Sequence, residues 1–459
     1  MNRILSLFLV LTVGAVCRGQ ELRQQNGQDG GRHTAVAALQ QTCQDVRQEI
    51  AADLNKAGGV YYAYPVIESL NTTPPKGYKP FYISHFGRHG SRYLLNDTDY
   101  SDVLDVLDKA HNAGALSELG EDVRGRVRRV WEDAYGRGGD LSPLGQKQHN
   151  DIARRMYKAY PQVFVPDARI TAHSTTVLRC SLSMSAFCEG LKEQQPGLFI
   201  PRESSRRQMY YMNYRTPAAN RYNGNDGPWR VEYDKFRDAN THPDRLIDTL
   251  FADREYARRF VDGGDLMWGL YWLAVGQQNI DAPVSFYDIF TPAELFDLWQ
   301  TFNYHMYIRC GNYKGNAGLM TDCTKPLLRN IVETAEQYVD SCTTGATLRF
   351  GHDSTIIPLA AVMRLDGCYA SKLRPDSVCR VFNDFRISPM AANVQLIFFR
   401  NKANDVIVKI MLNEREVGIP VPTDMFPFYR WEDVRDYYRK ILDAPDNPFP
   451  AHPYAIKAE

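Results

Sequence analysis

The chain has 459 residues, of which 44% are hydrophobic and 12% aromatic, so it can bury a large core and form two or three domains. Its 54 Lys and Arg residues balance its 54 Asp and Glu residues. This balance argues against general binding to nucleic acid or to a membrane surface, and it makes any affinity for anions a local property.

Residues 1–19 have the pattern of a secretory signal. Arg3 supplies a positive charge, the segment from Ile4 to Val16 is a short apolar run, and small or turn-prone residues follow. We expect export to the periplasm or out of the cell. A lipid anchor at Cys17 is the weaker alternative, because Val16 is a poor residue before a lipidated cysteine. No later segment has the apolar length to span a bilayer.

Residues 20–34 are rich in Gln, Gly and Arg and predict a flexible leader. Without Cys17 the chain retains eight cysteines, which suits an oxidising compartment. Cys310 with Cys323, and Cys368 with Cys379, are close enough in sequence to close loops as disulfides.

The first part of the chain alternates helix and strand patterns. Helices are predicted over 35–55, 100–113 and 142–160, and a further helix carries Arg179; strands are predicted over 81–84 and 168–172. A strand followed by a polar turn and a helix is typical of α/β proteins, where ligands bind at the carboxyl ends of strands.

Residues 196–340 interrupt this alternation. They begin with a polar, aromatic, arginine-rich stretch, and helical patterns follow at 244–262, 265–277 and 291–308. We interpret the segment as a mostly helical inserted cap domain. Within it, Arg202, Arg206 and Arg207 are candidates for binding a highly anionic substrate, and a solvated loop is the alternative.

The α/β pattern returns after residue 340. A strand at 346–350 leads through a turn at 351–355 into a helix, and strands follow at 393–400 and 406–412. The predicted fold is therefore α/β, with a Rossmann-like mixed central sheet flanked by helices. Residues 35–195 and 341–459 form its two parts around the insertion.

The stretch from Gly87 to Tyr93 is the most informative in the chain. It places two arginines, Arg88 and Arg92, four residues apart with His89 between them. Guanidinium groups match phosphate oxygens, and glycine lets the backbone approach a ligand closely. The pattern indicates a phosphate site that contains a reactive base.

Three motifs together resemble the histidine acid phosphatases, the large branch of the histidine phosphatase superfamily. The first is R-H-G-x-R at 88–92, the second is the segment from Ser174 through Arg179, and the third is the His352-Asp353 pair; the helix that starts at 142–149 (SPLGQKQH) also fits. The resemblance covers about 61–195 and 340–440.

The resemblance implies a role for each motif residue. His89 would attack phosphorus and carry the phosphoryl group, and Asp353 would protonate the leaving group. The remaining residues, expected to bind the phosphate oxygens, are Arg88, Arg92, Arg179 and His352. No metal or cofactor is implied. Taken alone, Asp353 is better explained as a helix cap.

The C-terminal segments VKIMLNEREVGIP and FYRWEDVRDYYRKIL resemble the multiple inositol polyphosphate phosphatases within that family. They imply phytate and lower inositol phosphates as substrates, with 2,3-bisphosphoglycerate as a further one. With the N-terminal signal pattern, we expect an exported phosphomonoesterase that acts as a monomer. That group usually has H-A-E where this chain has His352-Asp353-Ser354, so Asp353 is the expected acid, as in bacterial phytases. Two alternatives remain, a broad acid or sugar-phosphate phosphatase and a non-catalytic phosphate-binding protein.

Overall fold

The computed structural model describes residues 42–65, 71–372 and 374–447. The predicted signal segment, the leader and the start of the predicted 35–55 helix lie outside these ranges. The described residues all belong to one compact unit by their internal contacts. The division of the chain at 195/196 and 340/341 therefore stays a prediction.

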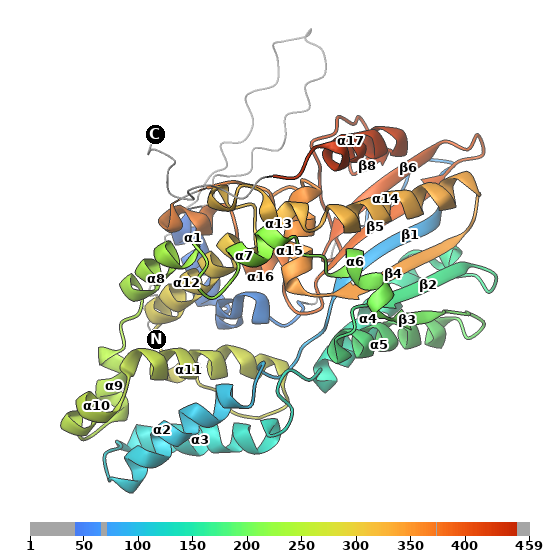
Figure 1. The fold of residues 1–459 in the computed structure, drawn as a ribbon. Coiled ribbons are helices and arrows are strands. Elements are labelled where there is room, and N and C mark those ends of the chain that lie inside the picture. The colour runs from blue at the N-terminus through green and yellow to red at the C-terminus, as the bar shows by residue number, and fades with distance from the viewer. Residues whose placement is uncertain (1–41, 66–70, 373, 448–459) are drawn as a thin grey trace, which may run out of the picture. The chain divides into compact units, whose positions relative to one another are not determined.

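One mixed sheet lies at the centre of the fold (Figure 1). Its strands are β1 Lys79–Arg88, β2 Arg169–Ser174, β3 Arg202–Ser204, β4 Gly345–Gly351, β5 Asn393–Arg400, β6 Val406–Leu412, β7 Arg415–Glu416 and β8 Phe428–Arg430. Their order is β3-β2-β4-β1-β5-β6-β7, and β8 pairs with β6. The strands from β3 to β1 run parallel, and β5 to β8 pair antiparallel. The predicted mixed α/β fold is confirmed.

Helices account for most of the other regular structure. The α-helices are α1 Cys43–Ala52, α2 Thr98–Asn112, α3 Glu118–Ala134, α4 Pro143–Ala159, α5 Leu178–Gln194, α6 Met209–Met212, α7 Pro217–Tyr222, α8 Arg230–Ala239, α9 Asp244–Leu250, α10 Arg254–Phe260, α11 Gly263–Gly276, α12 Pro292–Cys310, α13 Leu319–Asp322, α14 Lys325–Asp340, α15 Asp353–Val362, α16 Asp384–Ile387 and α17 Trp431–Asp443. Among the short 3₁₀ segments, those used below are η1 Leu54–Tyr61, η3 Arg206–Gln208 and η4 Gln277–Asn279.

The two faces of the sheet are covered by different helices. In Figure 1, α4 and α5 lie on one side, and α14 and α17 lie on the other. Side chains of β1 alternate between these layers: Ile83 packs in one hydrophobic cluster, and Tyr82 and Phe86 pack in the other. From Phe81 onward β1 is buried on both faces, so that even its polar residues Ser84 and His85 are buried.

The helical part draws on more of the chain than the predicted insertion. Between β3 and β4 the structure has only helices and irregular segments. The helices α2 and α3, which precede β2, also belong to this part, because α2 packs on α11 and α3 packs on α9 (Figure 1). Thus the helical layer is built from two separate stretches of the chain.

One predicted helix, at 244–262, is wrong as a continuous element. The structure has α9 and α10 there, separated at Phe251, which is extended and forms a bridge with Leu116. The side chain of Asp253 then accepts hydrogen bonds from the backbone N–H groups that open α10. The bridge from Phe251 to Leu116 and the cap at Asp253 therefore interrupt the helix that the spacing of apolar residues predicted.

The predicted pairing of Cys368 with Cys379 is also wrong. Cys379 is bonded to Cys43, 336 residues away in sequence, and Cys368 is a free, buried thiol. Cys310 and Cys323 are free as well. Nearness in sequence failed as a guide because the fold brings α1 beside the 375–380 segment.

The Cys43–Cys379 disulfide ties the first helix to the rest of the fold, so its loss should lower stability. We expect the Cys43→Ala/Cys379→Ala double variant to lose about 2–5 kcal/mol of unfolding free energy, seen as a fall in Tm. The matched control Cys342→Ala, at a free and exposed cysteine, should change it by less than about 1 kcal/mol. Equal effects of the two variants in thermal unfolding would contradict the assigned pairing.

Candidate active site

Three parallel strands deliver the candidate residues to one edge of the sheet. β4 lies between β1 and β2, and Arg88 at the end of β1 pairs with Gly351 at the end of β4. The chain leaves all three strands at the same edge, so the segments that carry His89, Arg179 and His352 lie together. The α/β pattern predicted from the sequence therefore brings the motif residues into one site.

The loop after β1 is held by close packing on α4. A Cβ atom at Gly90 would lie 2.4 Å from the backbone oxygen of Gly145, so only glycine fits there. The backbone N–H of Ser91 donates to Gln148 Oε1 (2.9 Å), and Gln148 Nε2 donates to Ser91 Oγ (2.9 Å). These contacts give a physical reason for the sequence SPLGQKQH at 142–149.

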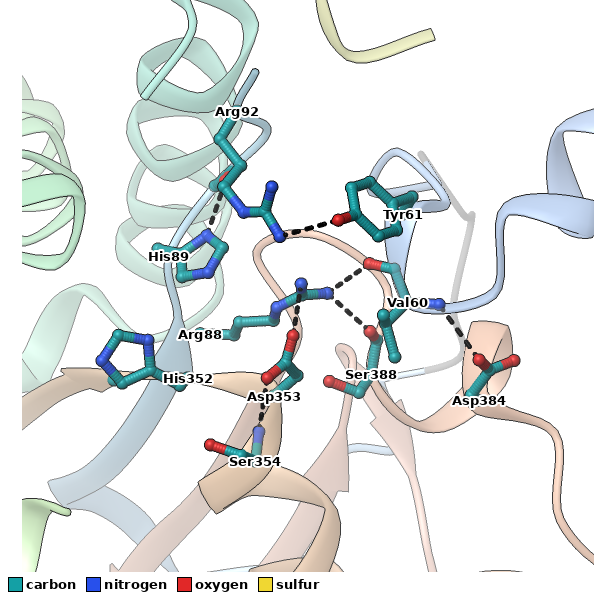
Figure 2. Close-up of polar contacts among 12 residues, drawn as sticks. Val60, Tyr61, Arg88, His89, Arg92, His352, Asp353, Ser354, Asp384 and Ser388 are labelled. Atoms are coloured by element: carbon teal, nitrogen blue, oxygen red, sulfur yellow. Dashed lines mark hydrogen bonds and ion pairs between the residues drawn. The ribbon is translucent and has the colours of Figure 1, made fainter. Parts of the chain in front are cut away.

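His89 is buried in this loop with a defined orientation. Its Nδ1 lies 2.9 Å from the backbone oxygen of Gly90 and donates a hydrogen bond to it, which leaves a lone pair on Nε2 (Figure 2). Burial lowers the pKa of His89 well below 6.5, and the charges of Arg88, Arg92 and Arg179 lower it further. The imidazole is therefore neutral, which is the form that can attack an electrophile.

The three arginines keep donors available for an oxyanion. The Nε atoms of Arg88, Arg92 and Arg179 are buried and have no hydrogen-bond partner among the described residues. Arg92 is held by Tyr61, whose hydroxyl accepts from Nη2 (3.3 Å) and whose ring lies 4.8 Å from the guanidinium carbon. Arg179 donates to the backbone oxygen of Gly139 at 3.5 Å.

Asp353 forms an ion pair with the first arginine. Arg88 Nη2 lies 2.7 Å from Asp353 Oδ2, and the other carboxylate oxygen accepts from the backbone N–H of Ser354 (2.6 Å) (Figure 2). Burial raises the pKa of Asp353, but the charges of Arg88 and Arg92 and the hydrogen bond from the Ser354 N–H outweigh burial and hold it below the usual 3.8. Asp353 is the first residue of α15, at the end of the helix where a capping role would place it. Its ion pair with Arg88 gives it a second role that a cap alone does not explain.

His352 occupies the N-cap position of α15 and lies beside His89. Its ring centroid is 5.8 Å from that of His89, and its Nε2 lies 3.2 Å from Thr175 Oγ1. Burial lowers its pKa to about 4, although the neighbouring Asp353 opposes this shift. A neutral His352 can serve as a hydrogen-bond donor to a bound anion.

The insertion supplies an arginine that the sequence analysis did not single out. Arg215, in the connection between α6 and α7, donates from Nη2 to the backbone oxygen of Ser354 (2.8 Å), and its charge lowers the pKa of His352. The candidates Arg202 on β3 and Arg206 and Arg207 on η3 are exposed.

Two further segments contact the arginines without belonging to any motif. Val60 and Tyr61, at the end of η1, contact Arg88 and Arg92, and the backbone oxygen of Ser388 accepts from Arg88 (Figure 2). Gly58-Gly59 was the available signal in the sequence, because paired glycines mark a close backbone approach.

The described residues contain no group of three or more His, Cys, Asp or Glu side chains arranged to hold a metal ion. Among the same residues, none of the helices has the length and apolar character needed to cross a bilayer.

Comparison with known proteins found one family and a set of solved structures. The family model described as "Histidine phosphatase superfamily (branch 2)" matches residues 87–413. A search of curated proteins by sequence found no significant match.

The solved structures share the fold at low sequence identity. The multiple inositol polyphosphate phosphatase of Bifidobacterium longum, solved with inositol hexasulfate, has a TM-score of 0.70 and 19% identity over 82% of this chain and 96% of its own. A phytase from D. castellii has a TM-score of 0.61 and 16% identity, covering 85% of each chain. The Hafnia alvei phytase with myo-inositol hexakis sulphate has a TM-score of 0.51 and 13% identity, over 81% of this chain and all of its own.

Proposed function

Because the chain belongs to branch 2 of the histidine phosphatase superfamily, and is thus a phosphatase, we propose that it hydrolyses inositol polyphosphates through a phosphohistidine on His89. The observation that carries this proposal is the neutral His89 surrounded by three arginines, with Asp353 paired to one of them. Binding alone would require neither a nucleophile nor an acid, so this arrangement disfavours a silent phosphate-binding protein.

The first chemical step transfers the phosphoryl group to the protein. His89 Nε2 attacks phosphorus, the bond from phosphorus to the ester oxygen breaks, and the leaving oxygen takes its electron pair. Arg88, Arg92 and Arg179 offset the negative charge of the phosphoryl oxygens through the transition state. A proton from Asp353 goes to the leaving alkoxide, so that an alcohol departs.

The second step returns the site to its starting state. Water attacks phosphorus and gives its proton to Asp353, the bond from phosphorus to His89 breaks, and inorganic phosphate leaves. In the unliganded protein the ion pair with Arg88 keeps Asp353 ionised. A bound phosphate competes for Arg88 and weakens that pair, so it raises the pKa of Asp353 when a proton donor is needed.

The substrate class rests on the insertion and on the fold relatives. Arg215 adds a cation from the helical part beside the phosphate site, as an ester with several phosphates requires. Two of the solved structures named above are complexes, one with inositol hexasulfate and one with myo-inositol hexakis sulphate. A general acid or sugar-phosphate phosphatase on the same machinery is the second candidate.

Export to the periplasm or out of the cell remains part of the proposal. It is supported by the N-terminal charge and apolar run. The Cys43–Cys379 disulfide also suits an oxidising compartment.

The role of Asp353 predicts a leaving-group effect that depends on pH. Alkoxides need a proton to leave and p-nitrophenolate does not, and the free enzyme holds the pKa of Asp353 low. We therefore expect kcat/KM for an alkyl phosphate, divided by that for p-nitrophenyl phosphate, to fall as pH rises from about 4 to 7. Asp353→Asn should make this ratio low and independent of pH. A flat ratio in the wild type would exclude Asp353 as the acid.

Substrate preference tests the inositol polyphosphate assignment. We expect kcat/KM to be higher for phytate than for glucose 1-phosphate or p-nitrophenyl phosphate, with His89→Ala as the inactive blank. Arg215→Ala should lower kcat/KM for phytate about tenfold or more, because a charged hydrogen bond is worth about 1.5–3 kcal/mol. It should affect p-nitrophenyl phosphate less.

The exposed Arg206 provides the matched control, and Arg206→Ala should change kcat/KM for phytate by less than about twofold. If Arg206→Ala lowered kcat/KM for phytate and Arg215→Ala did not, substrate specificity would depend on the arginines predicted from the sequence. Equal turnover of phytate and the small esters by the wild type would reduce the function to a general phosphatase.

A further inference from the structure

The Arg88 guanidinium is fixed from behind by two backbone carbonyls. Its Nη1 donates to the oxygen of Val60 and to the oxygen of Ser388 (2.9 Å), and its Nη2 faces Asp353 (Figure 2). Arg88 has no exposed surface. Its position therefore depends on what holds these two carbonyls in place.

A single buried residue, Asp384, contacts both of the peptide segments that carry those carbonyls. Its Oδ2 accepts from the backbone N–H of Val60 (3.2 Å), and its backbone oxygen accepts from the N–H of Ser388 (2.8 Å). Its Oδ1 accepts from the N–H of Phe385 (2.9 Å) and from Trp299 Nε1 (3.1 Å). As the first residue of α16, Asp384 needs only the contact with Phe385 to stabilise that helix end, so its contact with Val60 calls for another reason.

The approach of Asp384 to Val60 depends on a glycine. A Cβ atom at Gly59 would lie 2.3 Å from Asp384 Oδ2, and Gly59 has a φ of +55°. The carboxylate of Asp384 can therefore reach the N–H of Val60 because residue 59 of η1 has no side chain. Burial raises the pKa of Asp384 to about 7, and three N–H donors limit the rise by favouring the ionised form.

Tyr61, the residue after Val60, holds Arg92 in place. Tyr61 contacts Arg92 through its hydroxyl and its ring. The backbone oxygen of Tyr61 accepts from Asn279 Nδ2 (2.8 Å), and Asn279 Oδ1 accepts from Ser91 Oγ (2.7 Å). The short segment 59–61 thus contacts two phosphate-site arginines and is itself fixed at two points, by Asp384 and by Asn279.

We propose that Asp384 is a positioning residue of the phosphate site: through the backbone of Val60 and Ser388 it sets where Arg88 presents its donors, without touching the phosphate. The proposal rests on the proposed function, since it assumes that Arg88 binds the transferred phosphoryl group. That group is common to all phosphomonoesters. Asp384 therefore affects small and large esters alike, whereas Arg215 discriminates between them.

Asp384→Asn is the sharpest test because it alters one contact. The amide oxygen retains the two contacts at Oδ1, and the NH₂ group faces the N–H of Val60, which loses its acceptor. We expect the inhibition constant of inorganic phosphate, measured against p-nitrophenyl phosphate, to rise about tenfold or more, since small displacements cost up to about 100-fold. KM for p-nitrophenyl phosphate and for phytate should rise by a similar factor.

Trp299→Phe is the matched control, because it removes a donor to Asp384 on the side away from Val60. It should lower Tm and leave the phosphate inhibition constant within about twofold. A merely structural role for Asp384 would reduce the active fraction, and so the apparent kcat, without changing that constant. A folded Asp384→Asn protein with unchanged phosphate inhibition overturns the proposal, as does an equal rise in Trp299→Phe.

If Asp384→Asn does not fold, Asn279→Ser tests the same segment from its other fixed point. A rise in the phosphate inhibition constant would support the positioning role, and an unchanged constant would overturn it. Failure of the proposed function has a different outcome, because then the wild type would neither turn over the esters nor be inhibited by phosphate.

Discussion

The candidate site depends on keeping the Arg88 guanidinium buried. A charge without solvent is costly unless acceptors surround it, and Arg88 has a carboxylate on one side and two backbone carbonyls on the other. Those acceptors come from η1, from the start of α15 and from the segment after α16. Parts of the chain nearly 330 residues apart, Val60 and Ser388, must therefore meet at one guanidinium. This requirement ties the fold to the phosphate site.

The same concentration of positive charge gives the two reacting groups their protonation states. The cations and burial together keep His89 neutral, which an attacking imidazole requires. For Asp353 burial acts in the opposite direction, and the arginines outweigh it and hold the carboxylate ionised. In the proposed mechanism the arginines therefore do more than bind the phosphate oxygens. They keep His89 in the form that attacks phosphorus, and they set the proton affinity of Asp353.

Sequence reasoning recovered the groups that follow strands and missed those that act through backbone. Arg88, His89, Arg179 and His352 were accessible because each follows a strand in the α/β pattern, and the sheet register brings those ends together. The Ser388 carbonyl had no signal, since any residue carries one. For Val60 the signal was limited to the preceding glycine pair, Gly58-Gly59. Arg215 looked like its neighbours in an arginine-rich stretch, and only tertiary contacts distinguish it. The Cys43–Cys379 pair was missed for the same reason.

A rapid-quench experiment shows whether the phosphoryl group passes through His89. Labelled substrate is mixed with the wild-type protein, quenched in base within the first turnover, and digested for mass spectrometry. The account predicts one acid-labile, base-stable phosphopeptide with the phosphate on His89, absent from His89→Ala. Turnover with no phosphohistidine at any time, or with the label on another residue, would contradict it.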